Sequence, residues 1–371
     1  MILPLVVLTC GGARPLHAAE GGTPTTKTSA WNRIASAFVV PPQFTNDVGN
    51  YRSPLNFADG PPAKTPKEWQ RRRREILHYW HGAMGPWPEL LREPQFEMIG
   101  STNRETFVEH RVRVEVAPKQ FNAGYLLVPR GDGPFPAVVI PFYEPETSIG
   151  LGKPRRDFAL QLTKRGFVTL SIGSPGRDAW NPDTGIAKCQ PLSFLAYIAA
   201  NCHTALAQRK EVDPERIGIV GHSYGGKWAM FAACLYEKFA CGAWSDPGIV
   251  FDETRANVNY WEPWYLGLDP NRKRTPGIPG KENPRTGAYK EIFESGHDLH
   301  ELHALMAPRP FLVSGGSEDP PESWRALNHS IAVNALLGAT NRVAMTNRKS
   351  HDPTAESNEQ LYAFFEYFLR P

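Results

Sequence analysis

The second half of the chain alternates between short apolar runs and longer segments of helical periodicity. The apolar runs have the length of strands buried on both faces of a sheet: residues 136–142, 166–172, 216–221, 240–245, 310–314 and 342–346. The helical segments between and after them are residues 156–165, 192–210, 227–236, 328–337 and 359–369. This alternation favours an α/β fold, in which a mostly parallel twisted sheet is flanked by helices on both faces.

The first third of the chain has a different pattern. Residues 107–116 alternate between apolar and charged side chains, and residues 122–129 have the composition of a hairpin partner. Ahead of them, residues 66–81 repeat apolar side chains at helical spacing behind Thr65, which can cap the helix. We therefore predict an N-terminal extension over residues 20–105, with its helix at 66–81, and a catalytic domain over residues 106–371.

Residues 251–299 interrupt the alternation and form an insertion between a strand and a helix. The segment is rich in Pro, Gly, Lys and Arg after a group of aromatic side chains: Tyr260, Trp261, Trp264 and Tyr265. Insertions at this point often form lids or pocket walls. Trp261 and Trp264 are therefore candidates for stacking on a ring of the substrate, and ordinary packing within a lid is the alternative.

The N-terminus carries an apolar run that ends near Cys10 and is followed by Ala18-Ala19. The run is too short to span a membrane but suits the core of a signal peptide. We predict a signal peptide at residues 1–19 and hence a secreted or periplasmic protein with no membrane span. Lipidation at Cys10 and an uncleaved cytosolic start are the alternatives.

The remaining cysteines fit no zinc or redox motif, so neither chemistry is predicted from them. They are Cys189, Cys202, Cys234 and Cys241. Disulfides in an exported protein and buried free thiols are both compatible with their spacing.

Composition narrows the functional classes. The 371 residues are 41% hydrophobic and 21% charged, which suits a globular protein with a sizeable core. The formal net charge is +3, and Lys and Arg are scattered among Asp and Glu. The one dense basic cluster, Arg71–Arg74, falls on a predicted helix, where a solvated face explains it. We therefore expect no nucleic-acid partner. The sequence does not specify an oligomeric state.

Gly221-His222-Ser223-Tyr224-Gly225 has the G-x-S-x-G pattern of a nucleophile elbow. The motif follows a buried strand and precedes a helix rich in Ala and Met, as an elbow requires. Its glycines allow a sharp turn in which a Cβ would collide with neighbouring backbone. The turn exposes the hydroxyl of Ser223 above the sheet, so Ser223 is the predicted nucleophile and the chain is predicted to have the α/β-hydrolase fold.

A serine needs a base, and the base needs an acid that orients it. His351 lies between the last predicted strand and the last helix, where this fold keeps its base. Asp319 follows the strand at residues 310–314 and is the predicted acid. Glu318, which precedes Asp319, and Asp246, which follows the strand at 240–245, are the alternatives.

The oxyanion of the reaction requires preorganised donors. We expect one from the backbone N–H of Tyr224 and a second from the loop after residues 136–142, at Tyr143. This chemistry uses neither a metal nor an organic cofactor, and none is predicted.

Two motifs resemble the carbohydrate-esterase branch of the α/β hydrolases, which includes dienelactone-hydrolase-like proteins, acetyl xylan esterases and glucuronoyl esterases. The motifs are the elbow through Lys227 and the segment Asp298–Pro310, which ends in Ala-Pro-Arg-Pro, and the resemblance runs from about Trp69 to the C-terminus. In glucuronoyl esterases an Arg typically follows the nucleophile, where this chain has Tyr224. The resemblance implies a sugar contact for Lys227; a surface lysine on the helix is the alternative.

The predicted reaction is hydrolysis of a carbohydrate ester, or of another small acyl ester, through an acyl-enzyme. One alternative is a prolyl-oligopeptidase-like serine peptidase, whose elbow is similar but whose hydrolase domain usually follows a long β-propeller. A second alternative is a binding module that keeps the fold without catalysis.

Overall fold

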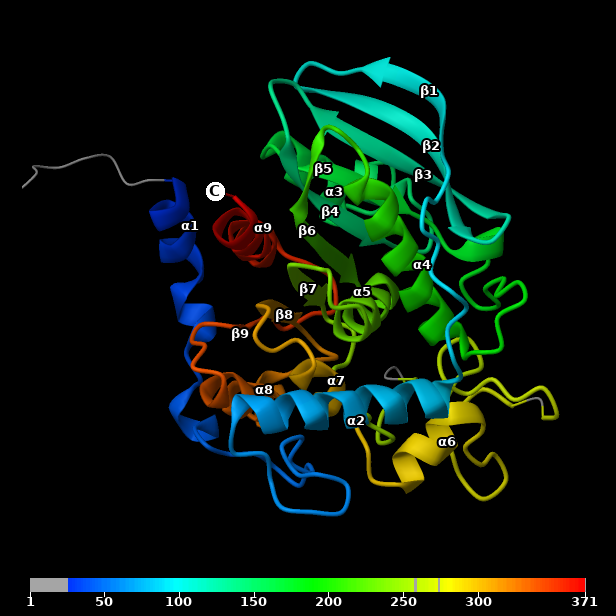
Figure 1. The fold of residues 1–371 in the computed structure, drawn as a ribbon, viewed down its shortest axis with the longest axis vertical. Helices are drawn as coiled ribbons and strands as arrows, with labels where there is room; N and C mark the ends of the chain where they lie inside the picture. Colours follow the sequence, from blue (N-terminus) through cyan, green and yellow to red (C-terminus); the bar gives the residue numbers. More distant parts are fainter. Residues whose placement is uncertain (1–25, 257–258, 273, 371) are drawn as a thin grey trace, which may run out of the picture.

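The structure of this protein is a computed structural model that describes residues 26–256, 259–272 and 274–370. One nine-stranded sheet runs through the centre of the molecule, in the order β1-β2-β3-β5-β4-β6-β7-β8-β9 (Figure 1). The pairs from β1 to β5 along this order are antiparallel, and all pairs from β5 to β9 are parallel. The predicted signal peptide at residues 1–19 and Cys10 lie outside the described residues.

The strands follow the predicted order along the chain, with one addition at the start. They are β1 (Phe96–Asn103), β2 (Phe107–Ala117), β3 (Gln120–Pro129), β4 (Phe135–Pro141), β5 (Val168–Ile172), β6 (Val212–His222), β7 (Cys241–Ser245), β8 (Phe311–Gly315) and β9 (Val343–Asn347). The helices are α1 (Thr26–Ile34), α2 (Pro66–Met84), α3 (Phe158–Lys164), α4 (Pro191–Ala207), α5 (Tyr224–Leu235), α6 (Gly287–Glu294), α7 (His300–Ala304), α8 (Trp324–Leu336) and α9 (Ala355–Leu369).

Helices cover both faces of the sheet because its central strands are apolar on both sides. Neighbouring residues of β4 point to opposite faces: Val139 joins the core under α4 and α5, and Val138 joins the core under α3 and α9. Both side chains have no exposed surface. The α/β-hydrolase architecture predicted from the alternation is therefore confirmed.

Strand β1 and helix α1 were not predicted. Most of β1 is exposed, and its sequence, Phe96–Asn103, carries no alternation of apolar and polar side chains. It is held by its antiparallel pairing with β2 at the edge of the sheet. Helix α1 packs against α9, where the rings of Trp31 and Tyr367 lie 5.0 Å apart. Part of the predicted extension thus belongs to the sheet and to the layer of helices that covers it.

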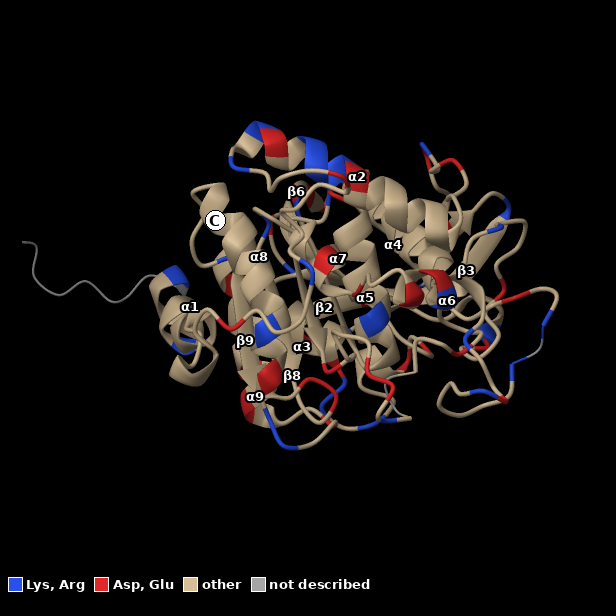
Figure 2. Ribbon diagram, turned by 90° about the horizontal axis from the view of Figure 1, so that it is seen from below, with Lys and Arg blue, Asp and Glu red and all other residues tan. Residues whose placement is uncertain are grey.

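Helix α2 confirms the predicted helix and corrects the expected role of its basic cluster. The hydroxyl of Thr65 accepts the backbone N–H of Glu68, which caps the first turn. Charges of both signs lie along α2 (Figure 2). Arg72, however, is buried: its Nε donates to Pro54 O at 3.1 Å, and its guanidinium pairs with Glu75 at 3.1 Å. The cluster is therefore not uniformly solvated, because one of its arginines ties the preceding segment to the helix.

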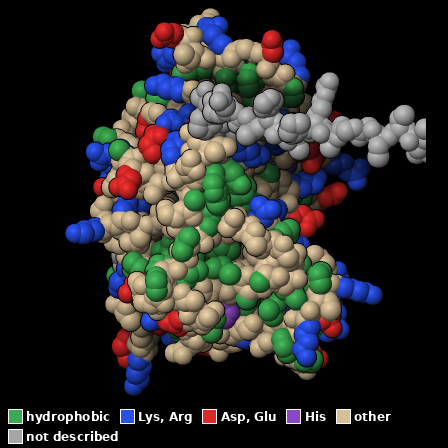
Figure 3. Space-filling view, turned by 90° about the vertical axis from the view of Figure 1, so that its left-hand side faces the viewer, with side chains coloured by type: hydrophobic (Ala, Val, Ile, Leu, Met, Phe, Trp, Pro, Cys, Tyr) green, Lys and Arg blue, Asp and Glu red, His purple; other side chains and the backbone are tan. Residues whose placement is uncertain are grey.

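The structure also bears on the predictions for the cysteines and for a membrane span. The cysteines at 189, 202, 234 and 241 are free and buried, so no disulfide forms among the described residues. No helix in the described part of the chain is long and apolar enough to cross a membrane. On the face shown in Figure 3, hydrophobic side chains gather near the centre and charged side chains of both signs surround them.

Candidate active site

The nucleophile elbow lies between the end of β6 and the start of α5. Ser223 has φ 55° and ψ −116°, a backbone conformation that L-residues rarely adopt. A Cβ at Gly221 would lie 2.0 Å from Gly225 O, and a Cβ at Gly225 would lie 2.2 Å from Pro141 O. Both positions therefore require glycine. The Ser223 N–H donates to Ser245 O at 2.8 Å, which fixes the turn against the neighbouring strand.

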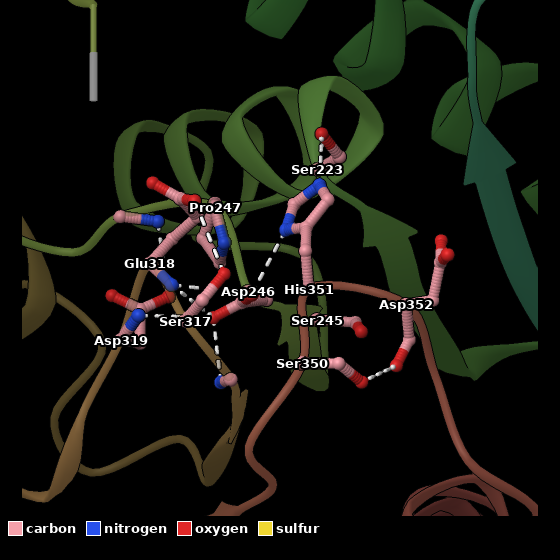
Figure 4. Close-up of polar contacts among 12 residues, drawn as sticks. Ser223, Ser245, Asp246, Pro247, Ser317, Glu318, Asp319, Ser350, His351 and Asp352 are labelled. Atoms are coloured by element: carbon pink, nitrogen blue, oxygen red, sulfur yellow. Dashed lines mark hydrogen bonds and ion pairs between the residues drawn. The ribbon is translucent and has the colours of Figure 1, made fainter. Parts of the chain in front are cut away.

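Ser223 and His351 meet as predicted. The hydroxyl of Ser223 lies 2.9 Å from His351 Nε2, and His351 Nδ1 lies 2.8 Å from Asp246 Oδ2. Figure 4 shows the imidazole between the serine and the carboxylate. The carboxylate on the Nδ1 side assigns the ring proton to that nitrogen, which leaves Nε2 free to accept the proton of the serine.

The structure corrects the predicted acid from Asp319 to Asp246. The carboxylate of Asp319 instead accepts the backbone N–H groups of Gly248 and Ile249, at 3.0 and 2.6 Å. Asp246 Oδ1 in turn accepts the N–H of Asp319 at 2.9 Å. Because β7 and β8 are parallel neighbours, the loops after them lie side by side, and β7 is the one next to the strand that carries Ser223.

Glu318, the other alternative, contributes its backbone and not its carboxylate to this arrangement. Its N–H donates to Asp246 Oδ1 at 3.1 Å, and the N–H of Gly316 donates to the same oxygen at 2.6 Å. Three backbone donors from the loop after β8, those of Gly316, Glu318 and Asp319, thus hold Asp246 in the orientation that His351 needs.

Burial shifts the pKa values of two ionisable side chains that lie behind Ser223, His351 and Asp246. Burial, and secondarily the nearby Asp246, raises the pKa of Asp319 to about 7. Burial lowers the pKa of Lys227 to about 8, against the opposing effect of Asp319. Lys227 Nζ donates to Pro247 O at 2.6 Å, and the side chain is only 4% exposed. Lys227 is therefore not the surface lysine of the alternative, and its bond within the loop after β7 does not support the predicted sugar contact.

Arg348 is a buried residue of the site that the sequence did not indicate. One terminal nitrogen donates to Ser314 O at 2.7 Å, and the other donates to His351 O at 2.6 Å and to Ser245 Oγ at 3.1 Å. The guanidinium thereby ties the loop that carries His351 to the ends of β7 and β8. No local pattern marks such a residue, because its partners at the ends of β7 and β8 are remote in sequence.

His222 lies beside the triad as a buried, uncharged ring. Burial, followed by the nearby imidazole of His351, holds the pKa of His222 well below its usual range. Its Nδ1 lies 3.1 Å from Ser245 O, and its ring centroid lies 4.7 Å from that of His351. A neutral ring here fills the space under His351 without adding a competing charge.

The predicted oxyanion donors lie beside the nucleophile. Tyr224 is the first residue of α5, so its backbone N–H has no partner within the helix. The side chain of Tyr143 stacks on that of Tyr224 at 4.6 Å. Burial raises the pKa of Tyr143, and the interaction of its phenol with the nearby Ser223 opposes that increase. The side chain of Tyr143 therefore lies near the nucleophile, and its backbone N–H as an oxyanion donor stays a prediction.

The two predicted stacking residues have different surroundings. Trp261 has no exposed surface and packs against Tyr289, with ring centroids 6.0 Å apart. A ring in that position cannot stack on a substrate, so this prediction is wrong and the packing alternative holds for Trp261. Trp264 is half-buried and contacts the ring of Trp180 edge-on at 4.8 Å. Among the described residues, no group of His, Cys, Asp and Glu is suited to hold a metal ion.

Comparisons with known proteins agree with this geometry. The chain matches the prolyl oligopeptidase family over residues 199–321. It is 23% identical over 360 residues to 4-O-methyl-glucuronoyl methylesterase from Neurospora crassa, across 88% of this chain and 83% of that protein.

Solved structures share the fold of this chain. A promiscuous esterase of the CE15 group from a marine bacterial metagenome superposes with a TM-score of 0.68 at 17% identity, across 86% of this chain and 98% of that one. A glucuronoyl esterase from Solibacter usitatus superposes with a TM-score of 0.66 at 16% identity, across 87% and 100% of the two chains.

The fold and the arrangement around Ser223 define a serine hydrolase of the α/β-hydrolase class. Within that class, the sequence and structural similarities are to the carbohydrate-esterase branch.

Proposed function

We propose that this protein hydrolyses carboxylic esters of carbohydrates, with esters of a uronic acid as the first candidates. The observation that carries the proposal is the continuous hydrogen-bonded series from Ser223 through His351 to Asp246. The glucuronoyl methylesterase of Neurospora crassa and the glucuronoyl esterase of Solibacter usitatus support the choice of substrate class.

The reaction follows from the positions of these groups. Ser223 Oγ attacks the ester carbonyl carbon while His351 Nε2 takes its proton, and Asp246 stabilises the imidazolium that forms. The negative charge on the carbonyl oxygen develops near the Tyr224 N–H and the Tyr143 hydroxyl, both of which can donate to it. When the tetrahedral intermediate collapses, His351 returns the proton to the leaving alcohol. Water then attacks the acyl-serine by the same route and releases the acid.

Because the chain matches the prolyl oligopeptidase family, peptides must also be tested as substrates. That match spans a smaller part of the chain than the similarities to esterases do. A substrate panel separates the two activities. It contains methyl glucuronate, acetylated xylan, p-nitrophenyl acetate and a chromogenic peptide with proline before the scissile bond. Activated esters alone would not decide, because serine peptidases also cleave them.

The experiment compares wild type with Ser223→Ala on this panel. We expect wild type to cleave at least one carbohydrate ester, and Ser223→Ala to lose that activity by about 10³-fold or more, because the nucleophile is gone. Ser101→Ala, on the exposed strand β1, is the matched control and should keep wild-type rates. Cleavage of the peptide alone would reject the esterase assignment, and equal rates in wild type and Ser223→Ala would reject the mechanism.

We also infer that the protein is exported, to the periplasm or the medium. The support is the apolar run within residues 1–19 together with a substrate that occurs in extracellular polymers. Mass spectrometry of the protein made in its own cells tests this inference. A mature chain that lacks the first residues is expected, and an intact chain that starts at Met1 would contradict it.

A further inference from the structure

A second carboxylate lies next to His351, on the side away from Asp246. Asp352 follows His351 directly in the chain, and its side chain is 72% exposed. In the view of Figure 4, the imidazole lies between the two acidic residues. The hydrogen bond from Arg156 and, to a smaller extent, the charge on His351 lower the pKa of Asp352. The carboxylate of Asp352 and the imidazole therefore interact electrostatically.

This second carboxylate is paired with a cation from another loop. The guanidinium of Arg156, in the loop after β4, donates to the carboxylate of Asp352. Arg156 has no other acidic partner in the described part of the chain, and its side chain is only 12% exposed. Its Cζ lies 5.9 Å from the ring centroid of Phe142, the first residue after β4. The ion pair thus joins the loop after β4 to the loop that carries His351.

The backbone before Arg156 is held in place from α9. Arg155 has φ 64°, a left-handed conformation that a non-glycine residue seldom adopts. Its carbonyl oxygen accepts the side-chain N–H of Asn358, in α9, at 2.8 Å. Such a conformation persists only where surrounding contacts enforce it. The position of Arg156 beside Asp352 is therefore fixed by the structure of the loop.

The charge on Arg156 also affects residues around the nucleophile. Together with Ser223, it opposes the increase in the pKa of Tyr143 that burial causes. After burial and the imidazole of His351, it contributes to the low pKa of His222. A carboxylate near an imidazole favours the protonated ring, and a protonated base cannot take the proton of a serine. Without Arg156, the charge of Asp352 would favour that inactive form.

We propose that Arg156 is a positioning residue of the reaction, which binds Asp352 and keeps the charge of that carboxylate from acting on His351. Asp246 then remains the carboxylate that stabilises the base. The inference rests on the proposed hydrolytic mechanism and deepens it, and it holds for any ester that the protein cleaves. A purely structural contact would only hold the two loops together.

Three variants test the proposal through the pH dependence of kcat/KM on the ester that wild type cleaves fastest. We expect the midpoint of the acid limb to rise by roughly 0.5 pH unit in Arg156→Gln and to fall by a similar amount in Asp352→Asn, because a single charge near a partly exposed imidazole has an effect of this size. The double variant should return close to the wild-type midpoint, since both charges are gone. Arg104→Gln, which removes an ion pair with Glu109 at the edge of the sheet, is the control and should keep the wild-type profile.

The other charged or titratable groups around His351 lie on the loops after β4, β7, β8 and β9 and at the end of β6: Tyr143, Lys153, His222, Asp246, Asp319 and Arg348. Lys153 acts on Asp352 in the same sense as Arg156, but less strongly. All of these groups are unchanged in the variants, so their effects cancel in the comparison with wild type.

An NMR titration of the His351 ring separates this inference from the proposed function, because it needs no substrate. The ring signal is identified by its absence from His351→Gln. Opposite shifts of its midpoint in the two single variants support the proposal, even if wild type fails to hydrolyse any ester and the proposed function falls. Midpoints that stay at the wild-type value, or that move in the same direction in both variants, overturn the proposal even if the esterase activity stands.

Discussion

Asp246 and Asp319 illustrate how finely position decides the role of a residue. Both are buried carboxylates with no exposed surface, and both follow neighbouring parallel strands. Asp246 reaches His351 Nδ1, and Asp319 binds two backbone amides in the loop that follows Asp246. One carboxylate therefore acts on the base, and the other acts on the shape of the loop.

We predict that Asp246→Asn lowers kcat by roughly 10³- to 10⁴-fold on any ester that wild type cleaves. The amide does not stabilise an imidazolium and can leave the wrong nitrogen of His351 protonated. Asp319→Asn should lower kcat by less than about tenfold and destabilise the fold by about 1–3 kcal/mol, because one backbone donor loses its acceptor. Steady-state kinetics and urea unfolding of both variants measure this. A larger loss of kcat in Asp319→Asn than in Asp246→Asn would contradict the assignment.

At the scale of the elements, the site depends on loops at the carboxyl ends of parallel strands. Ser223 follows β6, Asp246 follows β7 and His351 follows β9. The first two are fixed by tight turns close to their strands, whereas His351 is four residues beyond the end of β9. Arg348 supplies the missing constraint, since it donates to the His351 carbonyl and to the ends of β7 and β8.

Arg348→Ala should therefore lower kcat by about 10- to 100-fold with a smaller change in KM, because the base is present but poorly placed. Added guanidinium at millimolar concentration should restore part of the rate by occupying the vacated space. Arg348→Lys should also have a lower kcat than wild type, because an ammonium group cannot donate to several acceptors at once as a planar guanidinium does. If guanidinium restores no activity while the variant remains folded, Arg348 has only a packing role.

At the scale of the whole molecule, buried titratable groups make stability depend on pH. His303 in α7 has no exposed surface and packs between Trp244 and Phe311, with centroids 5.5 Å from each. Burial lowers its pKa to about 4. Between that value and the unfolded value near 6.5, the unfolded chain binds more protons at this residue than the folded one does. Its contribution to stability is thus complete above pH 6.5 and declines as the pH falls towards 4.

We predict that His303→Leu is less sensitive to acid than wild type is. Near pH 5 the protonation of His303 in the unfolded state costs wild type about 2 kcal/mol relative to pH 7, and the leucine variant lacks this cost. Buried Asp298, whose pKa burial raises to about 7, gives an opposite trend, but it is present in both proteins and cancels in their difference. Urea unfolding at pH 5 and pH 7 gives the comparison. An equal change in stability for both proteins would show that His303 is not buried in its neutral form.

Local sequence was enough to determine the core of this protein and its nucleophile. The apolar runs and helical periodicity specify elements whose side chains interact within a few residues, and the elbow motif is itself a local turn that only glycines permit. His351 could be predicted because the order of the elements places its loop above the sheet. The exposed edge strand β1 was missed because its side chains bury little surface and carry no periodic signal.

Tertiary structure alone decided which carboxylate serves His351, and which polar groups support it. Two acids at the ends of adjacent strands are equivalent along the chain, and only the sheet order and the amide donors of the facing loop distinguish them. Arg348, the phenol of Tyr143 and the open ring of Trp180 acquire their surroundings from segments remote in sequence. Contacts of that kind depend on how the loops pack in space, and no pattern of neighbouring residues encodes them.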